Sequence, residues 1–360
     1  MLSTGRKRSF DDRSVRHLSL GVERPRGQAR VCEAEGVRYI IYGAGAVGGV
    51  IGGRLAAVDR KVVLVARGSH LEALRSRGLL LRDPDGDTRP PVGVAASIAE
   101  AAPESGDVVF LTMKTQDTAA ALDELAALAP PGVAVVCAQN GVENERLALR
   151  RWPDVHAMCV VLPASHSEPG VVHAEAAPVS GVLDLGRYPT GADPVDYRII
   201  DDLRSARFDA YVDPSVMRWK NTKLLANLGN AIEATVGWGA PGASDLYKRL
   251  RAEGTDCFEA AGLQWATSDE EKAHRERLSP PRPVDGQHRG GGSSWQSLAR
   301  QTGTIEADWL NGEVVLLGRL YGVPTPVNAM LQAAANRMAR ERRDPGSLSI
   351  DDLHRLLPEG

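Results

Sequence analysis

The sequence predicts an α/β protein in which a doubly wound parallel sheet is followed by an all-helical domain. From Val37 onward, continuous apolar strand patterns alternate with helical patterns, which is typical of a parallel sheet covered on both faces. After about Asp213 the strand patterns give way to long helical ones. We therefore expect a sheet domain over residues 37–213 and a helical domain over residues 214–345.

Composition and charge narrow the functional classes. The chain has 360 residues, 43 % of them hydrophobic, which is enough for one large core or two ordinary ones. The net charge is −3, so neither nucleic acid nor a membrane surface is a predicted partner. No apolar run has the length of a membrane-spanning helix. The cysteines lack metal-ligand spacing, so we expect no metal site and a reducing, cytoplasmic location; they are Cys32, Cys137, Cys159 and Cys257.

The elements of the sheet domain are expected from their apolar runs. A strand over 37–42 leads into a helix over 47–57. Residues 79–82 and 92–94 are expected to form a hairpin around the turn-rich segment 83–87. A helix is expected over about 116–127, with further strands at 61–68, 107–112, 133–138, 156–162, 170–175 and 181–185.

The remainder of the chain is predicted to be helices, loops and tails. Long helical patterns cover 214–236, 244–261, 294–321, 327–341 and 349–357. The stretch 278–292 contains several prolines and three consecutive glycines, and is predicted to be a loop. Residues 1–36 are polar and without periodicity, so we expect a disordered tail there. Residues 346–360 are predicted to be a C-terminal tail with a short helix.

The glycine-rich turn after the first strand is the most informative motif. The first glycine permits a tight turn, the second lets the backbone approach a pyrophosphate, and the third lets helix and strand pack closely. The helix that follows offers free N–H groups and the positive end of its dipole to phosphates. This strand–turn–helix context predicts a Rossmann-type dinucleotide site, whose contacting residues would be Gly43, Ala44, Gly45, Ala46, Val47 and Gly48.

The end of the second strand indicates which dinucleotide is bound. An NAD site usually carries Asp or Glu there, bonded to the ribose 2′-hydroxyl. This chain has Ala66 followed by Arg67. A guanidinium binds a 2′-phosphate, whereas a carboxylate would repel it, so we predict NADPH/NADP as the cofactor with Arg67 as its 2′-phosphate clamp. The alternative is an ordinary solvated loop arginine.

One helix of the second domain carries a polar stripe. On a 3.6-residue period, Trp219, Lys223, Asn227 and Asn230 share one face, and the leucines between them occupy another. Lysine can donate a proton at useful pH, which arginine cannot do. The stripe therefore fits the floor of a polar cleft in which lysine faces a reacting carbonyl. The alternative is a solvated helix face with an ordinary lysine.

These motifs together resemble the ketopantoate reductase (2-dehydropantoate 2-reductase) family. The resemblance covers about residues 37–340. It rests on the ordered set of 43–48, Arg67, 113–115, 139–142, the Lys223 to Asn227 helix, 293–294 and 306–312. It implies an N-terminal Rossmann domain, a C-terminal helical domain and an active site in the cleft between them. It also implies a small-molecule 2-oxo acid substrate, NADPH as cofactor, and a monomer or homodimer.

The resemblance also implies individual roles. Lys223 matches the general acid that protonates the carbonyl oxygen. Asn227, with Asn230 nearby, and Ser294 match residues that bind the substrate hydroxyl or carboxylate. Lys114 and Asn140 match residues that contact the dinucleotide. Glu306 matches a residue at the nicotinamide end that contacts the cofactor and also belongs to the catalytic set.

The chain departs from the family pattern in the wall that contacts the substrate. Ala231 and Gly291 stand where asparagines are usual, and Trp295 is expected to add a large apolar surface to the pocket. The leading prediction is NADPH-dependent reduction of a 2-oxo acid, with ketopantoate as the first candidate. The alternatives are a related NADP-dependent dehydrogenase acting on a different hydroxy acid, and a catalytically silent NADPH-binding protein.

Overall fold

Eight strands form the main sheet of the computed structural model, which describes residues 36–166, 168–286 and 290–356. The predicted tail falls almost wholly on residues 1–35, outside the described part. The spatial order is β12 (Phe208–Val212), β11 (Gly181–Arg187), β8 (Val155–Val161), β7 (Ala134–Cys137), β6 (Val108–Leu111), β1 (Arg38–Tyr42), β2 (Lys61–Val65) and β5 (Gly93–Ala95). The six neighbouring strands β8, β7, β6, β1, β2 and β5 run parallel, and β11 is antiparallel to β8.

Both faces of this sheet are buried, as the continuous apolar runs predict. On one face, Ile41 and Phe110 pack with residues of α1 and α6; on the other, Ile40 and Val109 pack with residues of α3 and α4. The strand order reverses next to β1, so the turn after β1 opens at the point where α/β sheets bind ligands. The covering helices are α1 (Ala46–Ala56), α2 (Gly68–Arg77), α3 (Ile98–Ala101), α4 (Thr115–Leu128), α5 (Glu143–Leu149) and α6 (Pro194–Ser205).

The hairpin expected from 79–82 and 92–94 is wrong. Residues 93–95 instead pair with β2 at the edge of the main sheet. Asp83 closes a tighter turn, because its Oδ1 accepts hydrogen bonds from the backbone N–H of Asp85 (2.7 Å) and Gly86 (3.0 Å). The hairpin partner is thus the next short strand. A second, four-stranded sheet results, with the order β4 (Gly86–Thr88), β3 (Leu80–Asp83), β10 (Val171–Ala174) and β9 (Ala164–Ser165).

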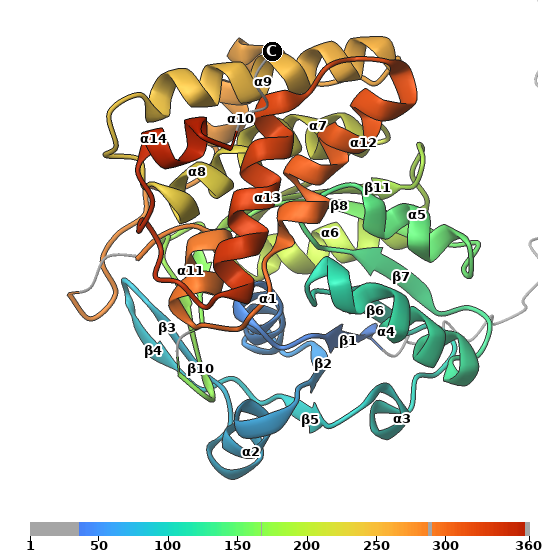
Figure 1. The fold of residues 1–360 in the computed structure, drawn as a ribbon. Coiled ribbons are helices and arrows are strands. Elements are labelled where there is room, and N and C mark those ends of the chain that lie inside the picture. The colour runs from blue at the N-terminus through green and yellow to red at the C-terminus, as the bar shows by residue number, and fades with distance from the viewer. Residues whose placement is uncertain (1–35, 167, 287–289, 357–360) are drawn as a thin grey trace, which may run out of the picture. The chain divides into compact units, whose positions relative to one another are not determined.

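The elements after β12 are helical, and they gather around a separate core (Figure 1, yellow to red). Among described residues their only strand-like contact is an isolated bridge between Ala176 and Pro281. They are α7 (Val216–Asn227), α8 (Gly229–Thr235), α9 (Ala243–Ala260), α10 (Ser268–Glu276), α11 (Ser293–Ala299), the 3₁₀ turn η1 (Glu306–Trp309), α12 (Asn311–Tyr321), α13 (Pro326–Arg340) and α14 (Ile350–His354). No helix in the described ranges has the length and apolar character needed to cross a membrane.

Two of the expected long helices are divided. The segment 294–321 forms α11, η1 and α12, because Gln301 and Gly303 adopt positive φ angles of 50° and 78° that end the first helix. The segment 214–236 is broken between Asn227 and Gly229. Helix α10 was not expected; it begins with a capping box in which Thr267 and Glu270 satisfy each other's backbone N–H groups.

Candidate active site

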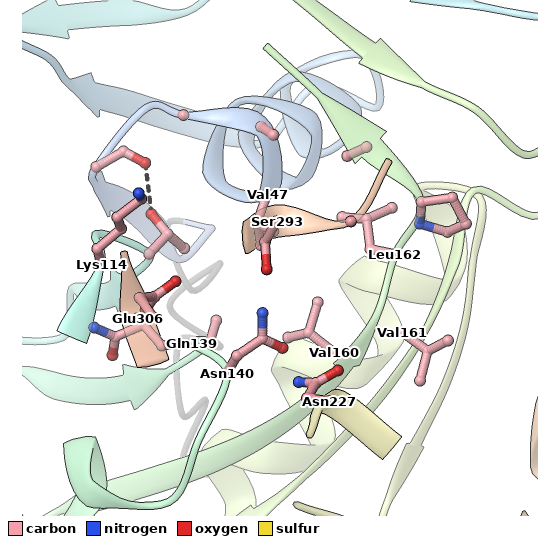
Figure 2. Close-up of a pocket in the computed structure, with 18 of the residues that line it drawn as sticks. Val47, Lys114, Gln139, Asn140, Val160, Val161, Leu162, Asn227, Ser293 and Glu306 are labelled. Atoms are coloured by element: carbon pink, nitrogen blue, oxygen red, sulfur yellow. Dashed lines mark hydrogen bonds between the residues drawn. The ribbon is translucent and has the colours of Figure 1, made fainter. Parts of the chain in front are cut away.

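One cavity of about 690 Å³ brings the separate motifs together. Residues from the glycine turn, the ends of β2 and β6, strand β8 and helices α7, α8, α10 and α11 line it. In Figure 2, Lys114 and Glu306 lie on one side, Asn227 and Val160 on the other, and Ser293 and Asn140 between them. The predicted site residues that line the cavity are Gly43, Ala44, Gly45, Ala46, Val47, Arg67, Lys114, Asn140, Lys223, Asn227, Asn230 and Glu306.

The glycines of the turn have different surroundings. Gly43 has φ of 113°, and a Cβ there would lie 2.6 Å from the backbone nitrogen of Met113. A Cβ at Gly48 would lie 2.4 Å from the carbonyl oxygen of Gly43, so this residue serves helix packing and does not line the cavity. A Cβ at Gly45 would meet no protein atom within 4 Å. The backbone at Gly45 is therefore open to a ligand at the start of α1.

A histidine pair fixes this turn to its surroundings. His70 Nε2 lies 2.8 Å from the carbonyl oxygen of Ala44, to which it donates. The neutral ring then accepts at Nδ1 from the Gly170 backbone N–H (2.8 Å) and from His166 Nε2 (3.1 Å). Burial lowers the pKa of His70, and burial together with nearby positive charge lowers the pKa of His166 to about 4. Both rings are neutral near pH 7 and line the cavity beside the glycine turn.

We expect low pH to reduce the stability that the histidine pair gives to the protein. A histidine whose pKa is lowered by folding stabilises the protein fully above pH 6.5, and this contribution is lost as the pH falls toward 4. For His166 the loss is on the order of 2–3 kcal/mol in the free energy of unfolding. Urea unfolding of wild type and His166→Gln at pH 7 and pH 4.5 measures it. The stability difference between the two proteins should shrink at pH 4.5; an unchanged difference contradicts the assignment.

Arg67 lies at the mouth of the cavity. It directly follows β2, its side chain is 79 % exposed, and its guanidinium is 3.7 Å from the Asp117 carboxylate. A partner at that distance and exposure holds the guanidinium weakly, so the guanidinium remains available to a second anion. Ala66, beside it, is buried and carries no carboxylate that would repel a 2′-phosphate.

Lys114 and Glu306 form a polar group between the two domains. The Lys114 ammonium donates to Ser297 Oγ at 2.6 Å, and burial lowers the pKa of Lys114 while Glu306 opposes the shift. The Glu306 carboxylate accepts from the backbone N–H (3.1 Å) and hydroxyl (3.2 Å) of Thr115 at the start of α4. Glu306 is thereby held by a helix N-terminus, where negative charge is stabilised.

A buried ion pair sets helix α7 against the sheet. The Lys220 ammonium is 2.6 Å from the Glu145 carboxylate of α5, and their side chains are 2 % and 0 % exposed. The same ammonium donates to the backbone oxygens of Gln139 (2.9 Å) and Met158 (3.3 Å). These contacts fix the rotation of α7, so that Lys223 and Asn227 face the cavity on the next turns.

The polar stripe of α7 and α8 lies along the cavity wall. The Lys223 ammonium donates to the carbonyl oxygen of Val160 on β8. The amide nitrogen Nδ2 of Asn227 is shielded from water and has no hydrogen-bond partner among the described residues. The same holds for the amide oxygen of Gln139, which also lines the cavity. Buried amide groups are normally satisfied, so these two atoms of the cavity lining are candidates for contacts with a ligand.

Two expectations about α11 need correction. Ser294 is 4 % exposed and does not line the cavity, whereas Ser293 does, with its Oγ 3.5 Å from Asn230 Nδ2. Successive side chains of a helix point 100° apart, so the two serines cannot share one direction. Trp295 also lies outside the cavity wall; its ring packs over the loop at Gly290 and Gly291, where a Cβ would come within 2.7 Å of it.

The prediction that the protein has no metal site stays a prediction. Among the described residues, His156, Asp193 and Asp196 bring potential ligand atoms within 4.8 Å of one another. Their contacts serve other purposes: His156 Nδ1 bonds Asp196 at 2.7 Å, Asp193 caps α6, and Arg187 pairs with Asp193 at 3.0 Å. These bonds explain why the three side chains lie together: they hold the N-terminus of α6 in place.

The fold and the cavity define a two-domain oxidoreductase that uses a nicotinamide dinucleotide. Family models described as "Ketopantoate reductase PanE/ApbA" and "Ketopantoate reductase PanE/ApbA C terminal" match residues 39–189 and 215–339. The chain belongs to the ketopantoate reductase family. Enzymes of this family are NADP-dependent oxidoreductases that act on CH–OH donors.

Individual relatives span the same length. A 2-dehydropantoate 2-reductase from Mesorhizobium japonicum is 30 % identical, over 85 % of this chain and 99 % of its own. One from Pyrococcus horikoshii is 27 % identical, over 86 % and 100 %. The solved ketopantoate reductase of Ralstonia eutropha superposes with a TM-score of 0.73 at 24 % identity, covering 85 % and 99 %. A D-mandelate dehydrogenase bound to NADH and anilino(oxo)acetate has a TM-score of 0.72 at 18 % identity, with the same coverage, and so shares the fold.

Residues that sequence reasoning missed come from segments without a motif. His70, His166, Ser297 and Arg300 line or support the cavity from separate elements. Gln139 was part of the family resemblance, but its unpartnered amide oxygen is a tertiary feature. No local pattern marks these residues, because each reaches the cavity only through the packing of distant segments.

Proposed function

We propose that this protein reduces a 2-oxo acid to a 2-hydroxy acid with NADPH, and that 2-dehydropantoate is the first substrate to test. The observation that carries the proposal is that Lys223 and the unpartnered Asn227 amide line the same cavity as the open glycine turn. The names of the Mesorhizobium and Pyrococcus relatives support this substrate. We further propose that the protein acts in the cytoplasm, as a monomer or homodimer.

The residues present fit NADPH. Gly45 leaves the backbone open for a pyrophosphate, and Arg67 provides an exposed guanidinium for the 2′-phosphate. The Gln139 amide oxygen is an acceptor for a carboxamide N–H, and Asn140 lies beside it. When bound, NADPH supplies the hydride for the reduction.

Lys223 is assigned the role of general acid. A hydride acceptor carbonyl develops negative charge on its oxygen, which a nearby ammonium stabilises and then protonates. Asn227 Nδ2 donates to the substrate one turn further along the helix, and Asn230 with Ser293 extends this donor set. Glu306, hydrogen-bonded to Thr115, keeps the N-terminus of α4 in place and offsets the charge of Lys114.

The experiment is a test of turnover. Consumption of NADPH is measured with 2-dehydropantoate and with a panel of other 2-oxo acids. Reduction of at least one acid supports the reaction type, and a preference for 2-dehydropantoate supports the named substrate. Tight NADPH binding without turnover of any acid rejects the proposal in favour of a silent binding protein.

Replacing Arg67 by aspartate is expected to weaken the binding of NADPH far more than that of NADH. The new carboxylate repels the 2′-phosphate and accepts from a 2′-hydroxyl, so NADPH affinity should fall at least tenfold while NADH affinity changes little. Cofactor titrations by fluorescence measure both constants. Arg75→Asp is the matched control, because Arg75 is exposed on α2 but does not line the cavity. Equal weakening of both cofactors contradicts the role of Arg67.

A further inference from the structure

The cavity continues past Lys223, away from the donors assigned to the substrate. Along α7, Asn227 lies one turn, about 5.4 Å, to one side of Lys223, and Trp219 lies one turn to the other. The Asn227 side leads to α8 and Ser293. The Trp219 side leads to α10. We name it the α10 end, and its lining residues are Trp219, Glu271, His274, Arg275 and Leu278.

The α10 end has a fixed aromatic wall. The Trp219 ring stacks on His274 with 4.3 Å between centroids and 23° between planes. Trp219 donates its indole N–H to Asp213 at 2.8 Å, and His274 Nε2 is hydrogen-bonded to the buried Asp184. Because the one polar atom of the indole is engaged by Asp213, the surface that this ring adds to the cavity is apolar.

The charges near this wall are paired or suppressed. The Glu271 carboxylate accepts from Arg275 (2.9 Å) and Arg251 (3.1 Å). In the cluster against which Trp219 packs, burial raises the pKa of the Cys159 thiol to about 11, so the thiol is neutral at pH 7. Val160 and Val161 follow it in the lining. The α10 end therefore combines aromatic and aliphatic surface close to Lys223 with an ion pair further out.

We propose that the α10 end is the side-chain subsite and that it binds an aromatic substituent of a 2-oxo acid more tightly than a methyl group. The inference rests on the proposed function for the orientation of the substrate. With the carbonyl at Lys223 and the carboxylate toward Asn227 and Ser293, the remaining substituent points along α7 to Trp219. A planar ring gains both apolar burial and aromatic contact there, whereas a methyl group gains neither.

Binding of unreactive analogues tests the subsite without turnover. Calorimetry with the NADP⁺-loaded protein compares oxamate, a mimic of a methyl 2-oxo acid, with N-phenyloxamate, which carries an aromatic ring. In the wild type, N-phenyloxamate should bind at least tenfold more tightly. Trp219→Ala should reduce this ratio to within twofold, and Trp219→Phe should keep most of it. Equal affinities in the wild type, or a full ratio in Trp219→Ala, overturn the proposal.

A second variant guards against misfolding. NADPH affinity is measured for each variant to show that the glycine turn is intact. If Trp219→Ala fails this check, Leu278→Asp replaces it, since a carboxylate in the same wall should lower the ratio at least threefold. An unchanged ratio in Leu278→Asp overturns the proposal as well. If the proposed reductase function is wrong, turnover is absent while the ratio of the two analogue affinities is preserved. Failure of the proposed function can therefore be distinguished from failure of the proposed subsite.

Discussion

Replacing Lys223 by alanine is expected to lower kcat by about 10²–10⁴-fold, the usual contribution of a positioned general acid. The variant removes the ammonium that stabilises and protonates the carbonyl oxygen. It leaves the glycine turn and Arg67 untouched, so NADPH affinity should stay close to that of the wild type. Steady-state kinetics with the best substrate of the panel and a cofactor titration measure the two effects separately.

Lys114→Ala is the matched comparison for Lys223→Ala. Lys114 is the other lysine that lines the cavity; burial lowers its pKa, and its ammonium donates to Ser297 beside Glu306. Its loss should raise KM for NADPH more than it lowers kcat, because we assign it to the cofactor half of the cavity. A kcat within tenfold of wild type in Lys223→Ala, about 1.4 kcal/mol in barrier, would remove Lys223 from the acid role. A larger kcat loss in Lys114→Ala would transfer that role to Lys114.

Replacing Lys220 by methionine is expected to destabilise the fold by about 3–5 kcal/mol, because it leaves the buried Glu145 carboxylate without its counter-charge. Burial already raises the pKa of Glu145, and Lys220 opposes that shift. Without the lysine, the carboxyl group must take up a proton or admit water. Urea unfolding at pH 7 measures the loss.

The double variant Lys220→Met with Glu145→Leu separates the ion pair from simple packing. Removing both charges from a buried pair is often neutral, so the double variant should recover most of the lost stability. A double variant as unstable as Lys220→Met would show that the backbone contacts of Lys220 with Gln139 and Met158 carry the effect. A Lys220→Met protein as stable as wild type would contradict the buried pair itself.

The sheet domain could be predicted because its signals are local. Buried strands such as 107–112 are continuous apolar runs, and the glycine turn identifies the strand and helix on either side of it. The hairpin prediction failed for a local reason too: the Asp83 side chain closes a shorter turn, so that residues 86–88, which begin within the expected turn, pair with the strand before it. Pairing is decided by such turn contacts more than by the apolar pattern of each strand.

The cavity wall was predictable where one helical pattern in the sequence carries its residues. Lys223, Asn227 and Asn230 have a spacing that brings them to one wall, and the break near Gly229 does not remove Asn230 from the cavity. For Ser294 the spacing was not enough, because the start of α11 decides which serine faces inward. At the α10 end only Trp219 had a sequence signal, through its place on the polar stripe, since His274 reaches Trp219 only through the tertiary fold.

The most direct test of the central claim is deuterium transfer from NADPH labelled at C4 of the nicotinamide. We expect the wild type, with a 2-oxo acid that it turns over, to yield a 2-hydroxy acid carrying one deuterium at C2. Mass spectrometry of the product measures this, and Lys223→Ala should form the same labelled product far more slowly. NADPH oxidation without deuterium at C2 of any product would contradict a cavity that aligns cofactor, carbonyl and Lys223 for hydride transfer.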